Sequence, residues 1–146
     1  MINSSKYDEK YTGYIACSLL IPESAEEIWK SVIYSVESDI KSRNEASQSL
    51  ALSMLATIMP QSLTTLSDAI FELALSTRTI PIVRKKALVC LARMIRKDPN
   101  KYDLKKVFSP LSEIFETKNS SSLSLLSGAT SLMLVVMNSI NPDQLK

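Results

Sequence analysis

Small residues recur at a regular interval along the sequence, and this repeat constrains the fold more than any other feature. Four short apolar strings of the sequence can be aligned with one another, and each begins with a small residue: Gly13, Ala51, Ala87 and Gly128. These four residues are separated by 38, 36 and 41 positions. Both glycines of the chain fall at this position, each inside an otherwise helical pattern. Because glycine in a helix interior costs about 1 kcal/mol relative to alanine, it is best explained by a second helix packing too closely for a larger side chain. A period of this length, with two helices per unit, is typical of an α-solenoid.

Prolines and capping residues divide the sequence into about seven helices. The second and third are expected to begin at capping boxes, Ser24 to Glu27 and Ser42 to Glu45. Pro81 suits the first turn of the fifth helix, and Pro110 predicts a kink or a fresh start in the sixth. Ser120 or Ser121 should cap the seventh. The expected helices cover residues 6–21, 24–40, 42–59, 62–75, 79–97, 103–117 and 120–137.

No segment shows the sustained period-two alternation of a half-buried strand, so the sequence predicts no sheet. The predicted fold is all-α, a HEAT/armadillo-like α-solenoid of about seven helices, or three and a half helical pairs, in a right-handed superhelix. The small position falls on the first, third, fifth and seventh helices, which leaves the first helix without its own partner. We therefore expect residues 1–146 to be a single helical-repeat fragment of a longer trunk.

Basic residues are concentrated in the second half of the chain. Residues 1–78 carry 6 basic and 10 acidic side chains, whereas residues 79–146 carry 11 basic and 5 acidic. A candidate patch facing an anionic lipid or a partner consists of Arg84, Lys85, Arg93, Arg96, Lys97 and Lys101. Each basic residue near an anionic membrane contributes about 1 kcal/mol. The alternative is that Arg96 and Lys97 satisfy the final carbonyls of the helix. The other basic side chains would then be solvated or paired with acidic neighbours.

Side chains that could support catalysis are scarce. The chain has no histidine, so serine–histidine and cysteine–histidine pairs cannot form within it. The two glycines make no phosphate-binding loop, and Cys17 and Cys90 alone make no zinc site. Glu26 and Glu27 fall in the first turn of a helix, where carboxylates favour the helix dipole. We therefore expect no enzyme activity, no metal and no cofactor, and the modest net charge of +2 predicts no nucleic-acid partner.

The two cysteines and the single tryptophan lie within apolar patterns. Cys17 and Cys90 are expected to behave as small buried hydrophobic residues without a disulfide, and Trp29 is expected in the core. The polar start lacks the apolar segment of a signal peptide. The apolar run at residues 131–137 is far shorter than the roughly 20 residues that cross a bilayer. These features predict a cytosolic chain.

Three strings resemble the early trunk of the large adaptins, subunits of clathrin-adaptor vesicle coats. They are residues 6–14 (KYDEKYTGY), 39–52 (DIKSRNEASQSLAL) and 83–99 (VRKKALVCLARMIRKDP), in the order and spacing of that family. The element Ser42-Arg43-Asn44 is most similar to α-type adaptins, whereas the element Arg84-Lys85-Lys86 is shared with other types. Residues 59–63 lack the usual acidic element of the family, and residues 120–126 are unusually rich in serine and leucine. The basic phosphoinositide-binding patch of α-adaptins lies further N-terminal in the family and is not transferred to any residue here.

The resemblance implies a structural subunit of an adaptor coat in vesicle-mediated transport and endocytosis. It implies a second large adaptin, medium and small chains and clathrin as partners, together with an anionic membrane reached through the whole complex and a small GTPase. The implied location is cytoplasmic and peripheral on membranes, at coated pits or vesicles. A generic HEAT/armadillo binding scaffold, of the transport-receptor or phosphatase-scaffold type, is the alternative from another class.

Overall fold

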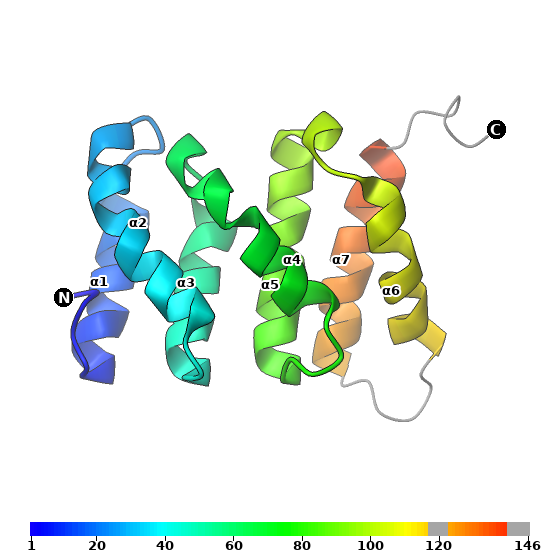
Figure 1. The fold of residues 1–146 in the computed structure, drawn as a ribbon, viewed down its shortest axis with the longest axis horizontal. Coiled ribbons are helices and arrows are strands. Elements are labelled where there is room, and N and C mark those ends of the chain that lie inside the picture. The colour runs from blue at the N-terminus through cyan, green and yellow to red at the C-terminus, as the bar shows by residue number, and fades with distance from the viewer. Residues whose placement is uncertain (117–122, 140–146) are drawn as a thin grey trace. The chain divides into compact units, whose positions relative to one another are not determined.

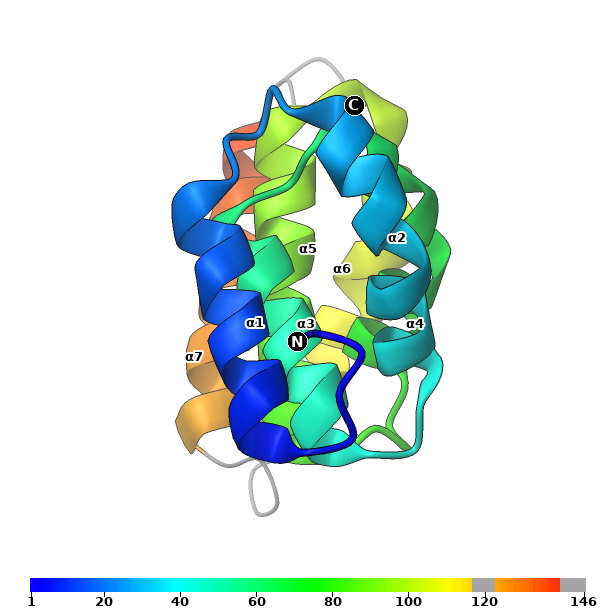
Figure 2. The same cartoon turned by 90° about the vertical axis from the view of Figure 1, so that its left-hand side faces the viewer.

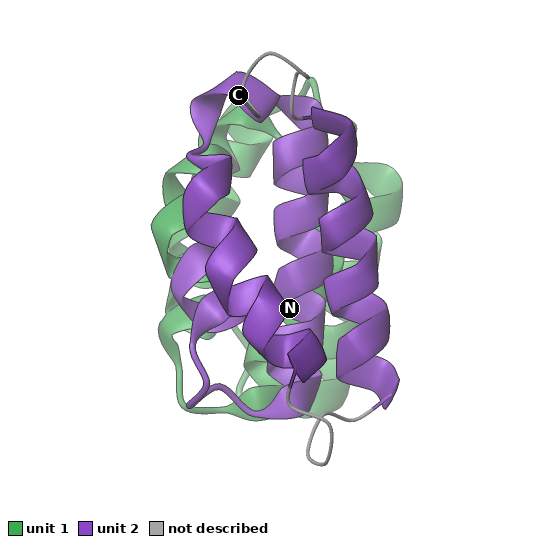
Figure 3. Cartoon of the chain, turned by 90° about the vertical axis from the view of Figure 1, so that its right-hand side faces the viewer, with its two compact units in different colours: residues 1–70 green, residues 71–146 purple. Residues whose placement is uncertain are grey.

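The computed structural model describes residues 1–116 and 123–139 (Figure 1). These described residues fall into two compact units, unit 1 and unit 2, with the boundary between residues 70 and 71 (Figure 3). The described residues hold seven α-helices, two 3-10 helices and no strand. The all-α prediction and the helical-repeat class are therefore confirmed. The handedness of the superhelix and the single continuous fragment stay predictions.

Unit 1 is built from α1 (Tyr7–Leu20), α2 (Glu26–Lys41), α3 (Glu45–Thr57) and the 3-10 helix η1 (Gln61–Leu66). Helix α3 packs against both α1 and α2, and η1 packs against α2 (Figure 2). Its largest fully buried side chains are apolar and come from α2, α3 and the turn after α3: Trp29, Ile40, Leu52, Leu55 and Met59, with Ile70 from the next helix. Trp29 is fully buried and donates a hydrogen bond from Nε1 to the Pro22 carbonyl at 3.0 Å, so its predicted place in the core is confirmed.

Unit 2 contains α5 (Pro81–Lys97), the 3-10 helix η2 (Pro99–Lys101), α6 (Leu104–Glu116) and α7 (Leu123–Ser139). Helices α5 and α7 run side by side, and α6 packs against α7 (Figure 3). Helix α4 (Ser67–Leu75) begins in unit 1 and ends in unit 2. The core of unit 2 is formed mainly by one face of α5, with Leu88, Leu91 and Ile95 fully buried.

The four small repeat positions are all buried, one on each of α1, α3, α5 and α7. A Cβ atom on Gly128 would lie 3.2 Å from the Lys85 carbonyl oxygen of α5, so α7 approaches the backbone of its neighbour closely there. At Gly13 the nearest atoms belong to the N-terminal segment instead of a helix. The Ile2 backbone nitrogen would lie 2.8 Å from the added Cβ. The helix–helix explanation therefore fits Gly128 directly, whereas Gly13 makes room for the residues that precede α1.

Both capping boxes predicted for unit 1 are wrong. Helix α2 begins at Glu26 after Ala25, and no side chain caps its start. Helix α3 is capped by Asn44, whose Oδ1 accepts hydrogen bonds from the amides of Ala46 at 3.0 Å and Ser47 at 3.1 Å. Asparagine is among the best N-cap residues, so Asn44 caps α3 in place of Ser42.

Two further expectations about the helices need correction. The fourth helix was expected to start at residue 62, but its first part is the 3-10 helix η1 and the α-helix begins at Ser67. Pro110 lies inside one continuous α6, so it does not start a new helix, while the alternative of a kink stays a prediction. By contrast, Pro81 occupies the first turn of α5 as predicted, where a missing amide hydrogen costs no intrahelical bond. The serine cap predicted at Ser120 or Ser121 lies outside the described residues.

Candidate functional site

The predicted basic patch divides into residues with different environments. Arg84 does not face solvent: it is buried, and its guanidinium binds the end of α4. Its Nε donates to the Ala74 carbonyl at 3.1 Å and its Nη2 to the Leu75 carbonyl at 3.4 Å. Burial lowers the pKa of Arg84 below its usual value. The inclusion of Arg84 in an exposed patch is therefore corrected, because this side chain satisfies the last carbonyls of a neighbouring helix.

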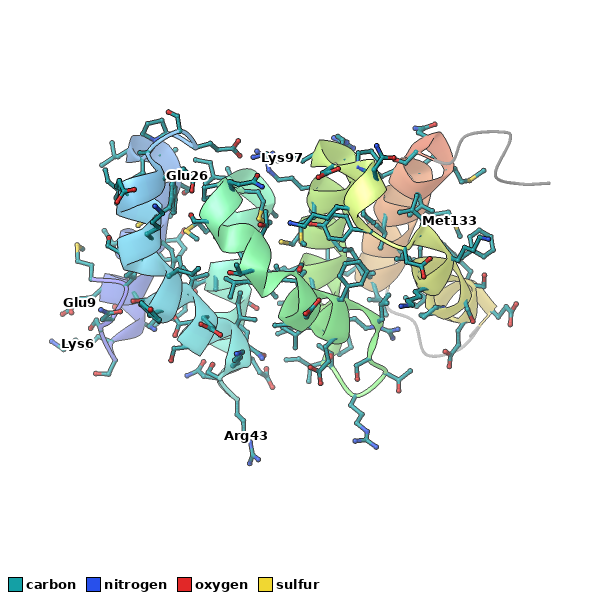
Figure 4. All side chains as sticks on the ribbon, turned by 45° about the horizontal axis from the view of Figure 1, so that its top comes forward. Lys6, Glu9, Glu26, Arg43, Lys97 and Met133 are labelled. Atoms are coloured by element: carbon teal, nitrogen blue, oxygen red, sulfur yellow. The ribbon has the colours of Figure 1, made fainter. Side chains whose placement is uncertain are left out.

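Three members of the predicted patch are exposed around the C-terminal end of α5: Arg96, Lys97 and Lys101 (Figure 4 labels Lys97). Two aspartates, Asp98 and Asp103, lie in the same short stretch of sequence. Cations at this end stabilise the negative pole of the helix dipole, so these side chains have a structural use without any ligand. Lys85 and Arg93 are half-buried on the body of α5.

A buried ionic cluster, formed by Lys10, Tyr14 and Asp39, ties α1 to α2. The Lys10 Nζ lies 2.6 Å from Oδ1 and 2.7 Å from Oδ2 of Asp39, and the Tyr14 hydroxyl donates to Oδ2 at 2.7 Å. The side chains of Lys10 and Asp39 are only 13% and 9% exposed, so the pair is almost withdrawn from water. These residues belong to two strings that carry the family resemblance, yet sequence reasoning did not bring them together. The one local sign of such a cluster in the sequence is that Lys10 and Tyr14 are four residues apart and so lie on the same face of a helix.

The Tyr14 hydroxyl should ionise only when unit 1 opens. Burial, and then the hydrogen bond and charge of Asp39, raise the pKa of Tyr14 far above the usual value of about 10. Since the folded state holds the proton more tightly than the unfolded state, the stability linked to Tyr14 is present below pH 10 and is lost as pH rises above it. Absorbance at 295 nm, followed with circular dichroism, should show a tyrosinate step that coincides with alkaline unfolding.

Comparison of two tyrosine variants checks this assignment. Tyr14→Phe should reduce the tyrosinate step linked to unfolding and leave only the contribution of Tyr102, whose pKa is also raised by burial. Tyr34→Phe is the matched control, because Tyr34 is 79% exposed on α2 and its loss should leave that step in place. A Tyr14→Phe chain that keeps the full step would contradict the assignment.

Two glutamates near the start of α2 bind the backbone one repeat later. The Glu26 carboxylate accepts from the amides of Gln61 at 2.8 Å and Ser62 at 2.9 Å, and Glu23 accepts from the amide of Met59 at 2.8 Å (Figure 4 labels Glu26). The sequence predicted that Glu26 stabilises the start of its own helix through the helix dipole. In the structure its carboxylate also caps η1. The Ser62 hydroxyl and the amides of Ser62 and Gln61 lie against this carboxylate and lower the pKa of Glu26.

Replacing Glu26 with glutamine should lower the melting temperature of the chain at pH 7 and have little effect at acidic pH. Because the folded state lowers the pKa of Glu26, its stabilisation is present above the ordinary carboxyl pKa of about 4.3 and disappears as pH falls through the lowered value. Thermal melts at pH 7 and below pH 4 test this. Glu27→Gln is the matched control, since Glu27 is exposed and pairs with Lys30 of its own helix at 2.8 Å. Equal shifts for the two variants at pH 7 would argue against the cap.

Other kinds of site find little support. Among residues 1–116 and 123–139, no group of three or more histidine, cysteine, aspartate or glutamate side chains could hold a metal ion. Within the same ranges, no helix is both long enough and apolar enough to span a bilayer. Cys90 is fully buried, and burial raises its pKa to about 12, whereas Cys17 is only half-buried on α1.

Comparison with known proteins gives a consistent set of relatives. The family model described as the adaptin N terminal region matches residues 1–146. AP-2 complex subunit alpha-1 of Arabidopsis thaliana is 32% identical over 139 residues, which is 94% of this chain and 13% of that protein. AP-2 complex subunit alpha and AP-1 complex subunit gamma-1 of Schizosaccharomyces pombe are 36% and 33% identical over 101 residues, or 68% of this chain and 11% of each relative. The chain thus spans about an eighth of the length of the first of these proteins.

Proposed function

Because the chain belongs to the adaptin N-terminal family, we propose that it forms part of the trunk of a large subunit of an adaptor coat. The single observation that carries this proposal is the match of the family over the whole of residues 1–146. The coat would act in vesicle-mediated intracellular protein transport and endocytosis. The relatives include both AP-2 alpha and AP-1 gamma subunits, so the α type is the narrower part of the proposal.

The role of such a trunk is mechanical and adhesive instead of catalytic. Stacked helix pairs bury a continuous core and leave elongated surfaces for other proteins. The buried ionic cluster of Lys10, Tyr14 and Asp39 supports this role, since it locks α1 against α2 at a fixed position. A buried pair of this kind specifies an arrangement more than it adds stability, which suits a scaffold.

The proposed partners follow from the names of the relatives. Those proteins are subunits of AP-1 and AP-2 complexes, so we propose a second large adaptin and medium and small chains as companions. Clathrin, an anionic membrane and a small GTPase would meet the assembled complex. The proposed location of the natural protein is the cytoplasm, peripheral on coated membranes.

Affinity purification of the natural protein that carries this sequence tests the proposal. A tag on that protein should recover another large adaptin and medium and small chains in equal amounts from cell extract, and an untagged strain provides the background. Recovery of a transport cargo or a phosphatase catalytic subunit in equal amounts, with no adaptor chains, would instead support the generic scaffold. A chain recovered alone would also contradict the adaptor proposal.

A further inference from the structure

Helix α5 exposes a basic face along most of its length. Its sequence, PIVRKKALVCLARMIRK, contains six basic residues and no acidic one. One of the six, Arg84, is turned inward. The other five are exposed or half-buried and surround the outer face of the helix: Lys85, Lys86, Arg93, Arg96 and Lys97.

The exposed face of α5 also carries two apolar side chains seven residues apart. Ile82 and Val89 are 56% and 36% exposed, and Arg96 is exposed seven residues further on. Residues seven apart lie two turns apart on nearly the same line of a helix. Lys85 and Lys86 lie between Ile82 and Val89 in sequence and flank that line. The row spans about 21 Å, from 14 residues at 1.5 Å each.

The position of Lys85 is fixed by the packing of α5 against α7. A Cβ atom on Gly128 would lie 3.3 Å from the Lys85 Cγ, so the aliphatic stem of Lys85 rests on the glycine. The small residue therefore leaves room for this stem to lie on α7. A long side chain that is already ordered loses less conformational entropy when it pairs with an anion.

We infer that the exposed face of α5 binds an acidic amphipathic helix from a partner protein. Ile82 and Val89 lie seven residues apart, the interval at which one contact position recurs when a helix packs along another, and Arg96 continues that line. Glutamates flanking the apolar stripe of the partner would face the lysines and arginines of α5, which gives the pairing its direction and register. This inference rests on the geometry of α5 and holds whether or not the chain works in an adaptor coat.

The shape of the face favours a helix over a membrane surface. Its exposed apolar residues are two modest aliphatic side chains in one line, without the aromatic residues that commonly sit at bilayer interfaces. The cations follow a row one helix wide, whereas a bilayer presents a broad plane.

A designed peptide tests the inference with the 146-residue chain. The probe is a helical peptide of about 18 residues, long enough for the row, with leucine at the a and d positions and glutamate at e and g. Fluorescence anisotropy should show saturable binding that weakens as salt rises from about 0.05 M to about 0.5 M. Lys85→Glu/Arg96→Glu should weaken binding by roughly tenfold or more through charge repulsion. Ile82→Ser/Val89→Ser, which keeps every charge, should weaken it by a few-fold.

Matched controls separate this site from non-specific attraction. Arg43→Glu/Lys105→Glu produces the same change in net charge at exposed positions outside α5 and should leave binding unchanged; Arg43 extends into solvent in Figure 4. Circular dichroism melts show whether each variant is folded. The inference is overturned if the probe does not bind, if a scrambled peptide of the same composition binds equally, or if the control variant loses as much affinity. Preference for vesicles rich in phosphatidylserine over the peptide would overturn it too.

Discussion

Replacing Asp39 with alanine is expected to lower the free energy of unfolding of unit 1 by about 3–5 kcal/mol, the cost of breaking a buried ion pair by removing one partner. The loss is large because Lys10 and the Tyr14 hydroxyl would remain buried without the carboxylate that both now bind. Urea denaturation followed by tryptophan fluorescence measures this directly. Trp29 is the only tryptophan of the chain and lies in the core of unit 1.

Two further variants show whether the effect comes from the buried charge. Glu37→Ala removes a carboxylate from the same helix, where Glu37 pairs with Lys41 at 2.6 Å but both side chains are well exposed, 36% and 61%. It should cost only about 0–0.5 kcal/mol. The triple variant Lys10→Met/Tyr14→Phe/Asp39→Leu removes all the polar groups together and should recover most of the lost stability. Similar losses for Asp39→Ala and Glu37→Ala would show that the cluster contributes nothing.

The second large effect is expected at Gly128. Leucine at this position should destabilise unit 2 by about 3 kcal/mol, because the side chain would collide with the backbone and stem of Lys85 on α5. Neither helix can move aside locally without disturbing the core that they share. Thermal melts followed by circular dichroism at 222 nm measure the loss.

A graded series makes the test of Gly128 specific. Gly128→Ala should be nearly neutral, since a gain in helix propensity of about 1 kcal/mol is offset by a small shift of the neighbour, whose carbonyl would lie 3.2 Å from the new methyl group. Ser127→Leu adds the same large side chain at the adjacent exposed position and should have little effect. A stable Gly128→Leu chain would refute the close approach of α7 to α5. Gly13→Leu should cost less, because the atoms nearest to an added Cβ belong to Met1 and Ile2, a short N-terminal segment that can shift more easily than a packed helix.

The helices could be predicted from sequence because their signals are local. Apolar spacing and prolines fix where a helix is present, so α1, α2, α3, α5, α6 and α7 all lie close to their expected ranges. The caps were harder, since a serine three residues before a glutamate satisfies the pattern whether or not the backbone turns there. Asn44 and Ser42 are two residues apart, and only the path of the chain decides which one reaches the free amides.

The residues that organise the two units could not be predicted, because their partners are distant in sequence. Arg84 looked like one of three adjacent surface cations, and only the position of the end of α4 shows that its guanidinium is needed inside. Likewise, Asp39 is 25 residues or more from Tyr14 and Lys10. A local pattern records which face of a helix is apolar, but it does not record which helix covers that face.

The carboxylates of Glu23 and Glu26 make the hydrogen exchange of three backbone amides depend on a distant part of the chain, the start of α2. Met59, Gln61 and Ser62 donate to side chains that lie 35 or 36 residues earlier in the chain. Hydrogen exchange at these amides can be fast only when the start of α2 detaches or when the following turn itself unfolds. The exchange rates of these amides should therefore change together with those of α2 when conditions change. This means that neighbouring repeats open as one cooperative unit and do not fray helix by helix.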